Sequence, residues 1–273
     1  MDAHENAAPE VTAPDKTDDQ YWLSGAWNFR DLGGLRTTDG ATLASGVLFR
    51  SSHLGDLDGE GQQRLEQLGI GAVFDLRGPR EIERGGADKL PASVRSVVRP
   101  FRRDHGEEDQ SRLAPHEAAR DQGIRQVTAA AARAFMERAY LEMPTLDGAA
   151  AAIIDVARTL TDGEQGVLFH CAAGKDRAGW TAISVLRAVG VTEDDIMADY
   201  LRSNAAIVPL RESLVATYGD VFELSDDILG VAEDYYLIAM QTVADRYGDF
   251  TGYLDAIGVD AALRARLRDR LLR

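Results

Sequence analysis

Cysteine is almost absent from this sequence, which has one such residue among 273. A single cysteine excludes an internal disulfide, so nothing in the fold requires an oxidising compartment. No window of ~18 apolar residues occurs, which argues against a membrane-spanning helix. The N-terminal segment also lacks the basic and then apolar stretches of a secretory signal. We therefore expect a cytoplasmic protein.

Positive charge is also scarce: 30 Lys and Arg residues stand against 45 Asp and Glu residues, for a formal net charge of −15. Such a balance argues against general binding to nucleic acids and against stable association with anionic membranes. The sequence leaves the oligomeric state open. An acidic protein that binds a phosphate group must do so through a local cluster of positive groups.

The remaining composition is that of a globular chain, with 45% hydrophobic and 27% charged residues. A chain of this length fits one large α/β domain better than two. Residues 1–20 carry few sizeable apolar groups and predict a disordered tail. Tyr21, Trp22 and Leu23 then arrive together, and we expect a single domain over residues 21–273.

Several other stretches have a readable periodicity. Short runs at residues 71–77 and 94–101 predict strands, the second of them at an edge of the sheet. Residues 59–68 and 146–160 predict helices, because their apolar residues recur with helical spacing. A further helical pattern covers residues 124–143.

The most informative stretch runs from Gly166 to Gly179. It begins with a short apolar run that predicts a buried strand, crosses a turn of small residues, and opens into a helical pattern near Ala178. A loop between a strand and a helix N-terminus directs several backbone N–H groups at one point, where the helix dipole adds partial positive charge. This segment therefore predicts a site for a phosphate group, and we call residues 171–177 the phosphate loop.

The residues of the phosphate loop supply the chemistry of phosphate-ester cleavage. Cys171 lies at its base, where the same field favours a thiolate at neutral pH. Arg177, six positions later, can hold two phosphoryl oxygens with its planar guanidinium group. Ala172, Ala173 and Gly174 are small, so the backbone can approach the anion closely. Together these features indicate attack on a phosphate ester through a phosphocysteine intermediate.

The loop and its flanks read His170-Cys171-x-Ala173-Gly174-Lys175-Asp176-Arg177-x-Gly179. This string resembles the protein tyrosine phosphatase superfamily, whose signature is His-Cys, five residues and then Arg. More narrowly, it resembles the bacterial branch with Gly-Lys-Asp-Arg in the loop. The resemblance, which extends over about residues 22–204, implies an α/β fold: a central, mostly parallel sheet flanked by helices, with an inserted helical segment.

Two motifs near the N-terminus also resemble that branch. One contains Arg30 and Asp31 before a pair of glycines, and the other contains Arg50 at the end of an apolar run. Taken alone, the first reads as a local ion pair beside a glycine turn and the second as the polar end of a strand. The resemblance instead implies that all three residues support the phosphate loop. Shorter matches at Glu81 and Asp199 belong to the same resemblance and have no assigned role.

Cleavage of a phosphate ester leaves an oxyanion that needs a proton, so a carboxylic acid must lie near the phosphate. Asp176, in the loop itself, is the favoured donor. Asp75 is the alternative, because it ends a predicted strand and sites form at the carboxyl ends of parallel strands; it is either an acid or the partner of an arginine. We expect His170 to position the loop and support the thiolate. Lys175 either contacts a substrate phosphate or is an exposed lysine.

This chemistry needs no metal and no other cofactor. His53, His105 and His116 have no companions that suggest metal ligation. The Gly-Lys pair of the loop does not indicate a nucleotide site, because the upstream glycine spacing and the following Ser or Thr are missing. The expected partner is a phosphorylated substrate: phosphotyrosine in protein, a phosphoinositide or a small phosphorylated metabolite.

A polar stretch followed by the predicted helix forms a candidate insertion over residues 102–145. The family that the loop resembles carries helices over the active site at this place in the chain. A lid of this kind would exclude water and restrict entry. An ordinary helical excursion on the surface is the alternative.

One position departs from the family pattern. The residue after the arginine is normally Thr or Ser, whose hydroxyl bonds the cysteine sulfur, and here it is Ala178. Loss of such a bond, ~1.5–3 kcal/mol, predicts hydrolysis of the phosphocysteine that is slower by about tenfold to a hundredfold. Thr181, one turn later, is a candidate partial substitute.

Ala178 is also the feature that favours the alternative function, a phosphate-binding pseudophosphatase that regulates without turnover. Retention of Cys171, Arg177 and Asp176 favours the enzyme instead. A sulfur- or arsenate-handling thiol enzyme is a weaker alternative, because the sequence has no second cysteine.

Overall fold

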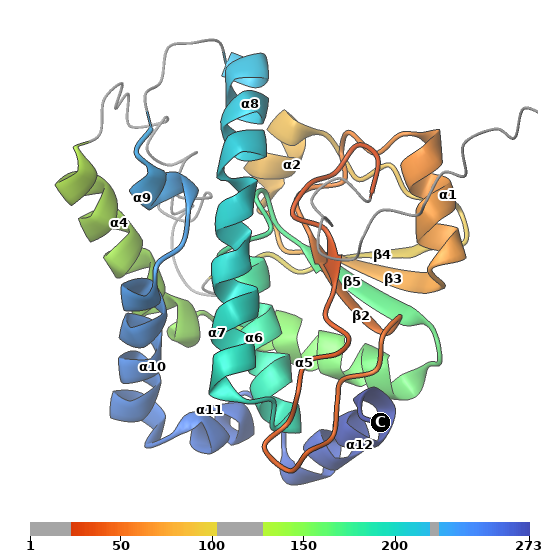
Figure 1. Ribbon diagram of the computed structural model, residues 1–273, viewed down its shortest axis with the longest axis vertical. Helices are drawn as coiled ribbons and strands as arrows, with labels where there is room; N and C mark the ends of the chain where they lie inside the picture. The colour runs from red at the N-terminus through yellow and green to blue at the C-terminus, as the bar shows by residue number, and fades with distance from the viewer. Residues whose placement is uncertain (1–22, 103–127, 219–223) are drawn as a thin grey trace, which may run out of the picture.

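The computed structural model describes residues 23–102, 128–218 and 224–273, so the predicted tail lies outside the described residues. At its centre is a five-stranded sheet with the order β1-β2-β5-β3-β4 (Figure 1). Strand β1 runs antiparallel to β2, and all other neighbours are parallel. The strands are β1 (Arg30–Asp31), β2 (Leu48–Ser51), β3 (Ile70–Asp75), β4 (Arg95–Val98) and β5 (Gly166–His170). The predicted α/β fold with a mostly parallel sheet is confirmed.

Strand β5 is the middle strand, and all of its residues are buried. An apolar run with neighbours on both edges is the pattern of a strand covered on both faces. The register places His170 opposite Ser51 of β2 and Asp75 of β3. The three strands therefore end at one edge of the sheet, and the phosphate loop begins at that edge.

Side chains that alternate along the strands build a core on each face of the sheet. Leu168 of β5 packs in the smaller core with Leu65 of helix α1 (Gly59–Gln67). Val167 and Phe169 belong to the larger core on the other face, which three further helices help to build. These are α5 (Asp147–Asp162), α6 (Arg177–Val189) and α12 (Ala261–Leu271).

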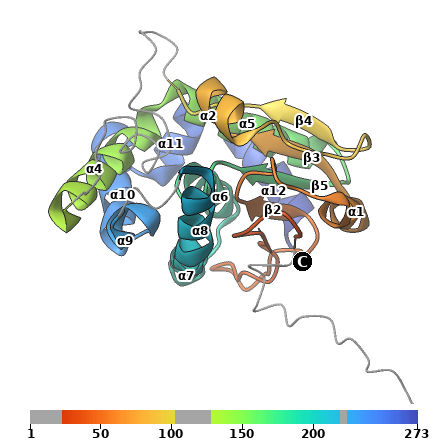
Figure 2. The same cartoon turned by 90° about the horizontal axis from the view of Figure 1, so that it is seen from above.

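Several of the remaining helices lie to one side of the sheet. Helices α4, α9 and α10 lie together on the side of α6 that faces away from β3 and β4, as both views show (Figures 1 and 2). Within the described residues, no helix combines the length and the apolar composition that crossing a membrane requires. The bounds are α2 (Pro79–Gly85), α4 (Ala129–Glu142), α7 (Glu193–Arg202), α8 (Ile207–Tyr218), α9 (Asp226–Leu229), α10 (Glu233–Tyr247) and α11 (Phe250–Ala256), with 3₁₀ turns at Met143–Thr145 and Ser203–Ala206.

The predicted elements are confirmed with small shifts at their ends. Strand β4 is shorter than the predicted run and, among the strands of the described residues, pairs only with β3, as expected of an edge strand. Helix α4 begins at Ala129, later than its predicted start, and the hydroxyl of the preceding Thr128 caps the helix by accepting a hydrogen bond from the N–H of Ala131. Residues 103–127 of the candidate insertion lie outside the described residues.

Candidate active site

The phosphate loop joins the end of β5 to the start of α6, as the sequence predicts. Gly174 makes the turn possible, because its φ of +70° is a left-handed conformation that residues with a side chain rarely adopt. A Cβ atom at this position would lie 2.4 Å from the carbonyl oxygen of Ser51. The loop is thus packed directly against the end of β2.

Four carbonyl groups of the loop accept hydrogen bonds from donors outside it. The pairs are His53 N with Ala172 O at 3.1 Å, Asn28 Nδ2 with Ala173 O at 3.0 Å, and Arg50 Nη2 with Gly174 O at 2.7 Å and Lys175 O at 3.2 Å. In a trans peptide the N–H group points opposite to the carbonyl group. The amides of these peptides are therefore turned away from the outer donors, as an anion-binding loop requires.

Cys171 and Arg177 lie at the two ends of the loop. The thiol of Cys171 is buried and in no disulfide. The guanidinium group of Arg177 is held in a two-pronged ion pair by Glu81 of α2, with both N–O distances at 2.6 Å. Arg177 also donates to the carbonyl oxygen of Leu76 at 3.3 Å. These contacts fix the orientation of a side chain that would otherwise have many rotamers.

Asp176 occupies the N-cap position of α6 but makes no capping hydrogen bond. Its carboxylate instead accepts a hydrogen bond from the hydroxyl of Tyr140 in α4 at 2.8 Å. It also pairs with the ammonium group of Lys175 at 3.0 Å, and that group donates to the carbonyl oxygen of Gly230. Lys175 is 1% exposed, so the reading of an exposed lysine is wrong.

Asp75 lies at the end of β3, beside His170. Both of its carboxylate oxygens accept hydrogen bonds from Arg77, at 2.9 Å from Nε and 2.8 Å from Nη2. Arg77 reaches Asp88 as well, at 2.8 Å. Of the two roles predicted for Asp75, this arrangement fits the partner of an arginine.

His170 is fully buried between the sheet edge and the segment after α2. Its Nε2 lies 2.7 Å from a carboxylate oxygen of Asp88 and its Nδ1 lies 3.3 Å from the carbonyl oxygen of Cys171. Burial favours the neutral ring, but the carboxylates of Asp88 and Asp75 outweigh it and raise the pKa of His170 above its ordinary value.

Asp75, Asp88 and His170 are also the kinds of residue that ligate metals, and their ligand atoms lie within 4.8 Å of one another. The guanidinium group of Arg77 is bonded to both carboxylates, so a cation already balances their charge. The donor set fits a buried ion network better than a metal centre.

Arg30 of β1 and Arg50 of β2 lie opposite each other in the sheet, and both bind Asp199 of α7. Arg30 Nε lies 2.6 Å and Arg50 Nη1 lies 2.7 Å from its two carboxylate oxygens. Burial, and then the nearby charge of Arg50, lower the pKa of Arg30 to about 10. Arg30 also donates to the side chain of Asn28, which holds the loop.

The interpretation of Arg30 and Asp31 as a local ion pair is therefore wrong. Asp31 accepts hydrogen bonds from the N–H groups of Gly33 at 2.9 Å and Gly46 at 2.7 Å. It ties together the turns between β1 and β2. The two adjacent residues face different neighbours because successive side chains of a strand point to opposite sides.

Ala178 is fully buried in the first turn of α6. The hydroxyl of Thr181 donates to the carbonyl oxygen of Arg177, one turn back in the helix, at 3.0 Å. Its proton is therefore used by the helix backbone, which speaks against the expected partial substitution for the missing hydroxyl at residue 178.

Several residues around the loop were not predicted as site residues. Glu81 and Asp199 stood in family-like motifs without a role, and the Pro79 start of α2 gave a signal for the helix that carries Glu81. Asn28 stood in the same family-like motif as Arg30, also without a role. Asp88 and Tyr140 gave no signal, because each reaches the loop only through the tertiary fold.

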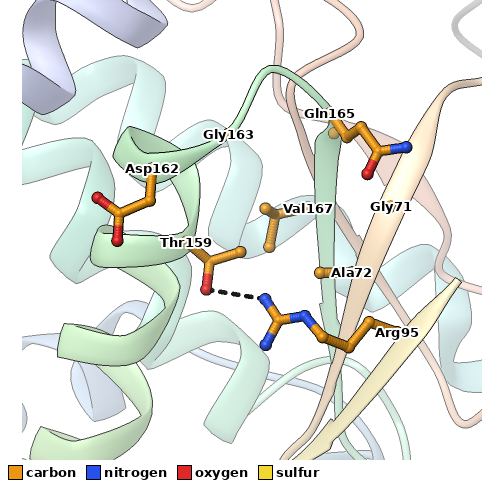
Figure 3. Close-up of a pocket in the computed structure, with 9 residues that line it drawn as sticks. Gly71, Ala72, Arg95, Thr159, Asp162, Gly163, Gln165 and Val167 are labelled. Carbon is orange, nitrogen blue, oxygen red and sulfur yellow. Dashed lines mark hydrogen bonds between the residues drawn. The ribbon is translucent and has the colours of Figure 1, made fainter.

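A surface pocket of about 340 Å³ lies at the opposite end of β5 (Figure 3). It is lined by Gly166 and Val167 where β5 begins, by Arg95 of β4 and by Thr159 of α5, with Arg95 donating to the Thr159 hydroxyl at 3.3 Å. Cys171 follows the other end of the strand, so this pocket is separate from the phosphate loop.

A buried parallel strand that leads through a cysteine-containing loop to an arginine at a helix N-terminus defines a phosphatase of the cysteine-dependent kind. The chain belongs to the tyrosine phosphatase family, whose model matches residues 21–273. The substrates of such an enzyme are phosphorylated molecules.

The chain is 37% identical over 277 aligned residues to the triple specificity protein phosphatase PtpB of Mycobacterium tuberculosis, which covers 92% of this chain and 98% of that protein. It is 32% identical over 239 residues to a Cupriavidus necator protein provisionally named a tyrosine-protein phosphatase, with 86% and 83% covered. The crystal structure of P. aeruginosa TpbA with pTyr shares 14% identity at a TM-score of 0.32, over 74% of this chain and 90% of that chain.

Proposed function

We propose that Cys171 is the nucleophile of this phosphatase, that Arg177 and the loop amides hold the phosphoryl group, and that Asp176 exchanges the proton. One observation carries the proposal: the carbonyl groups of the loop are bound from outside it, so its amides converge on the other side. A thiolate at the start of such a loop faces a site built for a phosphate.

The first step transfers the phosphoryl group to sulfur. The Cys171 thiolate attacks phosphorus, the S–P bond forms and the P–O bond to the leaving group breaks. Arg177 and the amides stabilise the negative charge on the three equatorial oxygens. Asp176 gives its proton to the leaving oxygen. In the second step a water molecule, deprotonated by Asp176, attacks phosphorus and releases phosphate and the thiolate.

Asp176 suits the acid better than Asp75 because of where each carboxylate lies. Asp75 ends strand β3, outside the loop, and both of its oxygens accept hydrogen bonds from Arg77, which hinders the approach of a leaving group. Asp176 also pairs with a cation, Lys175, and accepts a hydrogen bond from Tyr140, but it belongs to the loop itself and directly precedes Arg177. Its failure to cap α6 leaves the carboxylate turned away from its own helix.

We extend the proposal to a broad range of substrates. The Mycobacterium relative is named a triple specificity phosphatase, and its identity with this chain runs along nearly the whole of both. We expect phosphotyrosine in protein as one class, and phosphoinositides or small phosphorylated metabolites at the same loop. Comparison of kcat/KM for a phosphotyrosine peptide, a phosphoserine peptide and a short-chain phosphoinositide tests this. Activity on the phosphotyrosine peptide alone would contradict it.

The roles are tested with p-nitrophenyl phosphate in the presence of EDTA. We expect the wild type to turn over and Cys171→Ser to lose more than about 10³-fold in kcat, because the chemistry needs the thiolate. Asp176→Asn should slow alkyl phosphates more than p-nitrophenyl phosphate, since p-nitrophenolate leaves without help from an acid. Full activity of Cys171→Ser, or loss of wild-type activity in EDTA, would contradict the mechanism.

A further inference from the structure

The ring of His170 faces an oxygen acceptor at each of its two nitrogens. Nε2 lies 2.7 Å from the carboxylate of Asp88, and Nδ1 lies 3.3 Å from the carbonyl oxygen of Cys171. Neither acceptor has a proton to give when Asp88 is ionised. A neutral imidazole carries only one N–H group, whereas the imidazolium carries two. Both contacts are hydrogen bonds only if the ring is doubly protonated.

The surroundings of the ring support its positive charge. Asp88 and Asp75 face it, the latter at 3.9 Å, while Arg77 and His53 oppose a positive charge. The carboxylates prevail, and the pKa of His170 lies above its ordinary value. Burial, and then the charge of Arg77, lower the pKa of His53, so this histidine carries less positive charge to oppose that of His170.

Asp88 is itself fixed in place. One of its carboxylate oxygens accepts from Arg77 at 2.8 Å and the other faces His170. The carboxylate is nearly buried, with a side-chain exposure of 4%. The positive end of the Asp88–His170 pair therefore points toward Cys171 and its negative end toward Arg77.

We propose that Asp88 is a positioning residue that keeps His170 in the imidazolium form, and that this cation holds the backbone of Cys171 and stabilises its thiolate. The inference rests on the proposed function, because it concerns the nucleophile of that reaction. A positive charge next to a cysteine favours the ionised sulfur. Asn28 and Arg50 donate hydrogen bonds to later carbonyl groups of the loop. The donor from His170 does the same for the carbonyl group of Cys171, at the start of the loop.

The thiolate is measured by the rate at which iodoacetamide alkylates the protein as a function of pH. Cys171 is the single cysteine, so the rate reports this residue alone and needs no turnover. In Asp88→Asn we expect the midpoint of the profile to move to higher pH by ~0.5–1 unit, which lowers the rate at pH 6 about threefold to tenfold. The plateau rate at high pH should stay the same.

Asp56→Asn is the matched control. Asp56 is an exposed carboxylate that lies 3.7 Å from His53, so the control removes a nearby charge without touching His170. Its alkylation profile should overlay that of the wild type. An unchanged midpoint in Asp88→Asn, or an equal shift in Asp56→Asn, would overturn the proposal.

NMR of the imidazole nitrogens provides a test on the unaltered protein, should Asp88→Asn fail to fold. We expect His170 to show two N–H protons near neutral pH and to lose one only above its ordinary titration range. A singly protonated ring at pH 6.5 would overturn the proposal. Failure of the proposed function is a separate outcome: the chain would then hydrolyse no phosphate ester, although the alkylation and NMR results still report on Cys171 and His170.

Discussion

The carboxylate of Asp176 is held by two donors from outside its own helix, the Tyr140 hydroxyl and the Lys175 ammonium group. Aspartate at an N-cap position normally accepts a backbone N–H of its own helix, and this one does not. Its position is instead set by Tyr140 and Lys175. At the residue scale, we therefore expect the orientation of this carboxylate to depend on Tyr140.

Tyr140→Phe tests that dependence. The change removes the hydroxyl but keeps the ring, which packs against Tyr200 and Tyr235. If the bond to the carboxylate contributes ~1.5 kcal/mol, we expect kcat for phenyl phosphate to fall on the order of tenfold, with a smaller fall for p-nitrophenyl phosphate. Tyr235→Phe is the control, because the Tyr235 hydroxyl donates to the carbonyl oxygen of Asp227 and not to Asp176. Equal losses with both substrates would speak against a role through Asp176.

Ala178 is the second determinant at this scale. Its side chain lacks the hydroxyl that would stabilise the departing thiolate, and the proton of Thr181 is used by the helix. Hydrolysis of the phosphocysteine should therefore be the slow step, with a burst of p-nitrophenol before steady turnover.

Ala178→Thr is expected to raise the steady-state rate about tenfold to a hundredfold, because one hydrogen bond to a charged sulfur is worth ~1.5–3 kcal/mol. Stopped-flow measurement should show the burst shrinking. Ala178→Val, which has the same shape without the hydroxyl, controls for the added bulk at this buried position. A faster Val variant would mean that packing, and not the hydroxyl, sets the rate.

At the scale of elements, α7 is joined to the loop through two buried arginines. Asp199 in α7 binds both Arg30 and Arg50, and Arg50 holds the loop carbonyls. Ser203, in the turn after α7, accepts a further bond from Arg30 at 3.1 Å. Helix α7 thus fixes the arginine that shapes the loop, although none of its residues needs to touch a substrate.

Asp199→Asn should destabilise the fold by about 3–5 kcal/mol, because it leaves two buried guanidinium groups with less negative charge to balance them. Burial opposes ionisation, but the two arginines outweigh it and lower the pKa of Asp199 below its ordinary value. A lowered folded-state pKa means that this contribution is present above the ordinary aspartate pKa and is lost as pH falls through the folded-state value.

Urea unfolding at several pH values measures both effects. Asp195→Asn is the control, since Asp195 pairs with Arg36, whose side chain is 69% exposed, and such pairs contribute about 0–1 kcal/mol. A loss in Asp199→Asn no larger than in the control would contradict the assigned role.

At the scale of the whole molecule, the site is assembled from most of the chain. Asn28 and Arg50 come from the N-terminal part, Glu81 and Asp88 from the segment after β3, and Tyr140 from α4. The C-terminal residue is joined to the N-terminal part of the fold, because Arg273 and Thr42 exchange backbone hydrogen bonds at 2.9 and 3.1 Å. The protein has a net charge of −15. Among the described residues, Arg50, Lys175 and Arg177 are each paired with a carboxylate, so the proposed phosphate site depends on where these positive charges are placed rather than on an excess of them.

The sequence by itself determined the parts of the site that are local. Cys171 and Arg177 are separated by one short loop between a strand and a helix, and this spacing alone predicts that both serve the proposed phosphate site. The strands β3 and β5 and the helices α1 and α5 were equally predictable, because their apolar periodicity reflects burial against one sheet.

Only the tertiary structure decided which groups hold these residues in place. Glu81 for Arg177, Tyr140 for Asp176, and Asp88 for His170 are 96, 36 and 82 positions away. No periodicity encodes such pairs, because each depends on how separate elements pack at the carboxyl edge of the sheet. The same holds for Arg30, whose adjacent aspartate suggested a local pair while the fold supplied Asp199. Buried charges must find opposite charges wherever the packing brings them, and the packing is set by the whole chain.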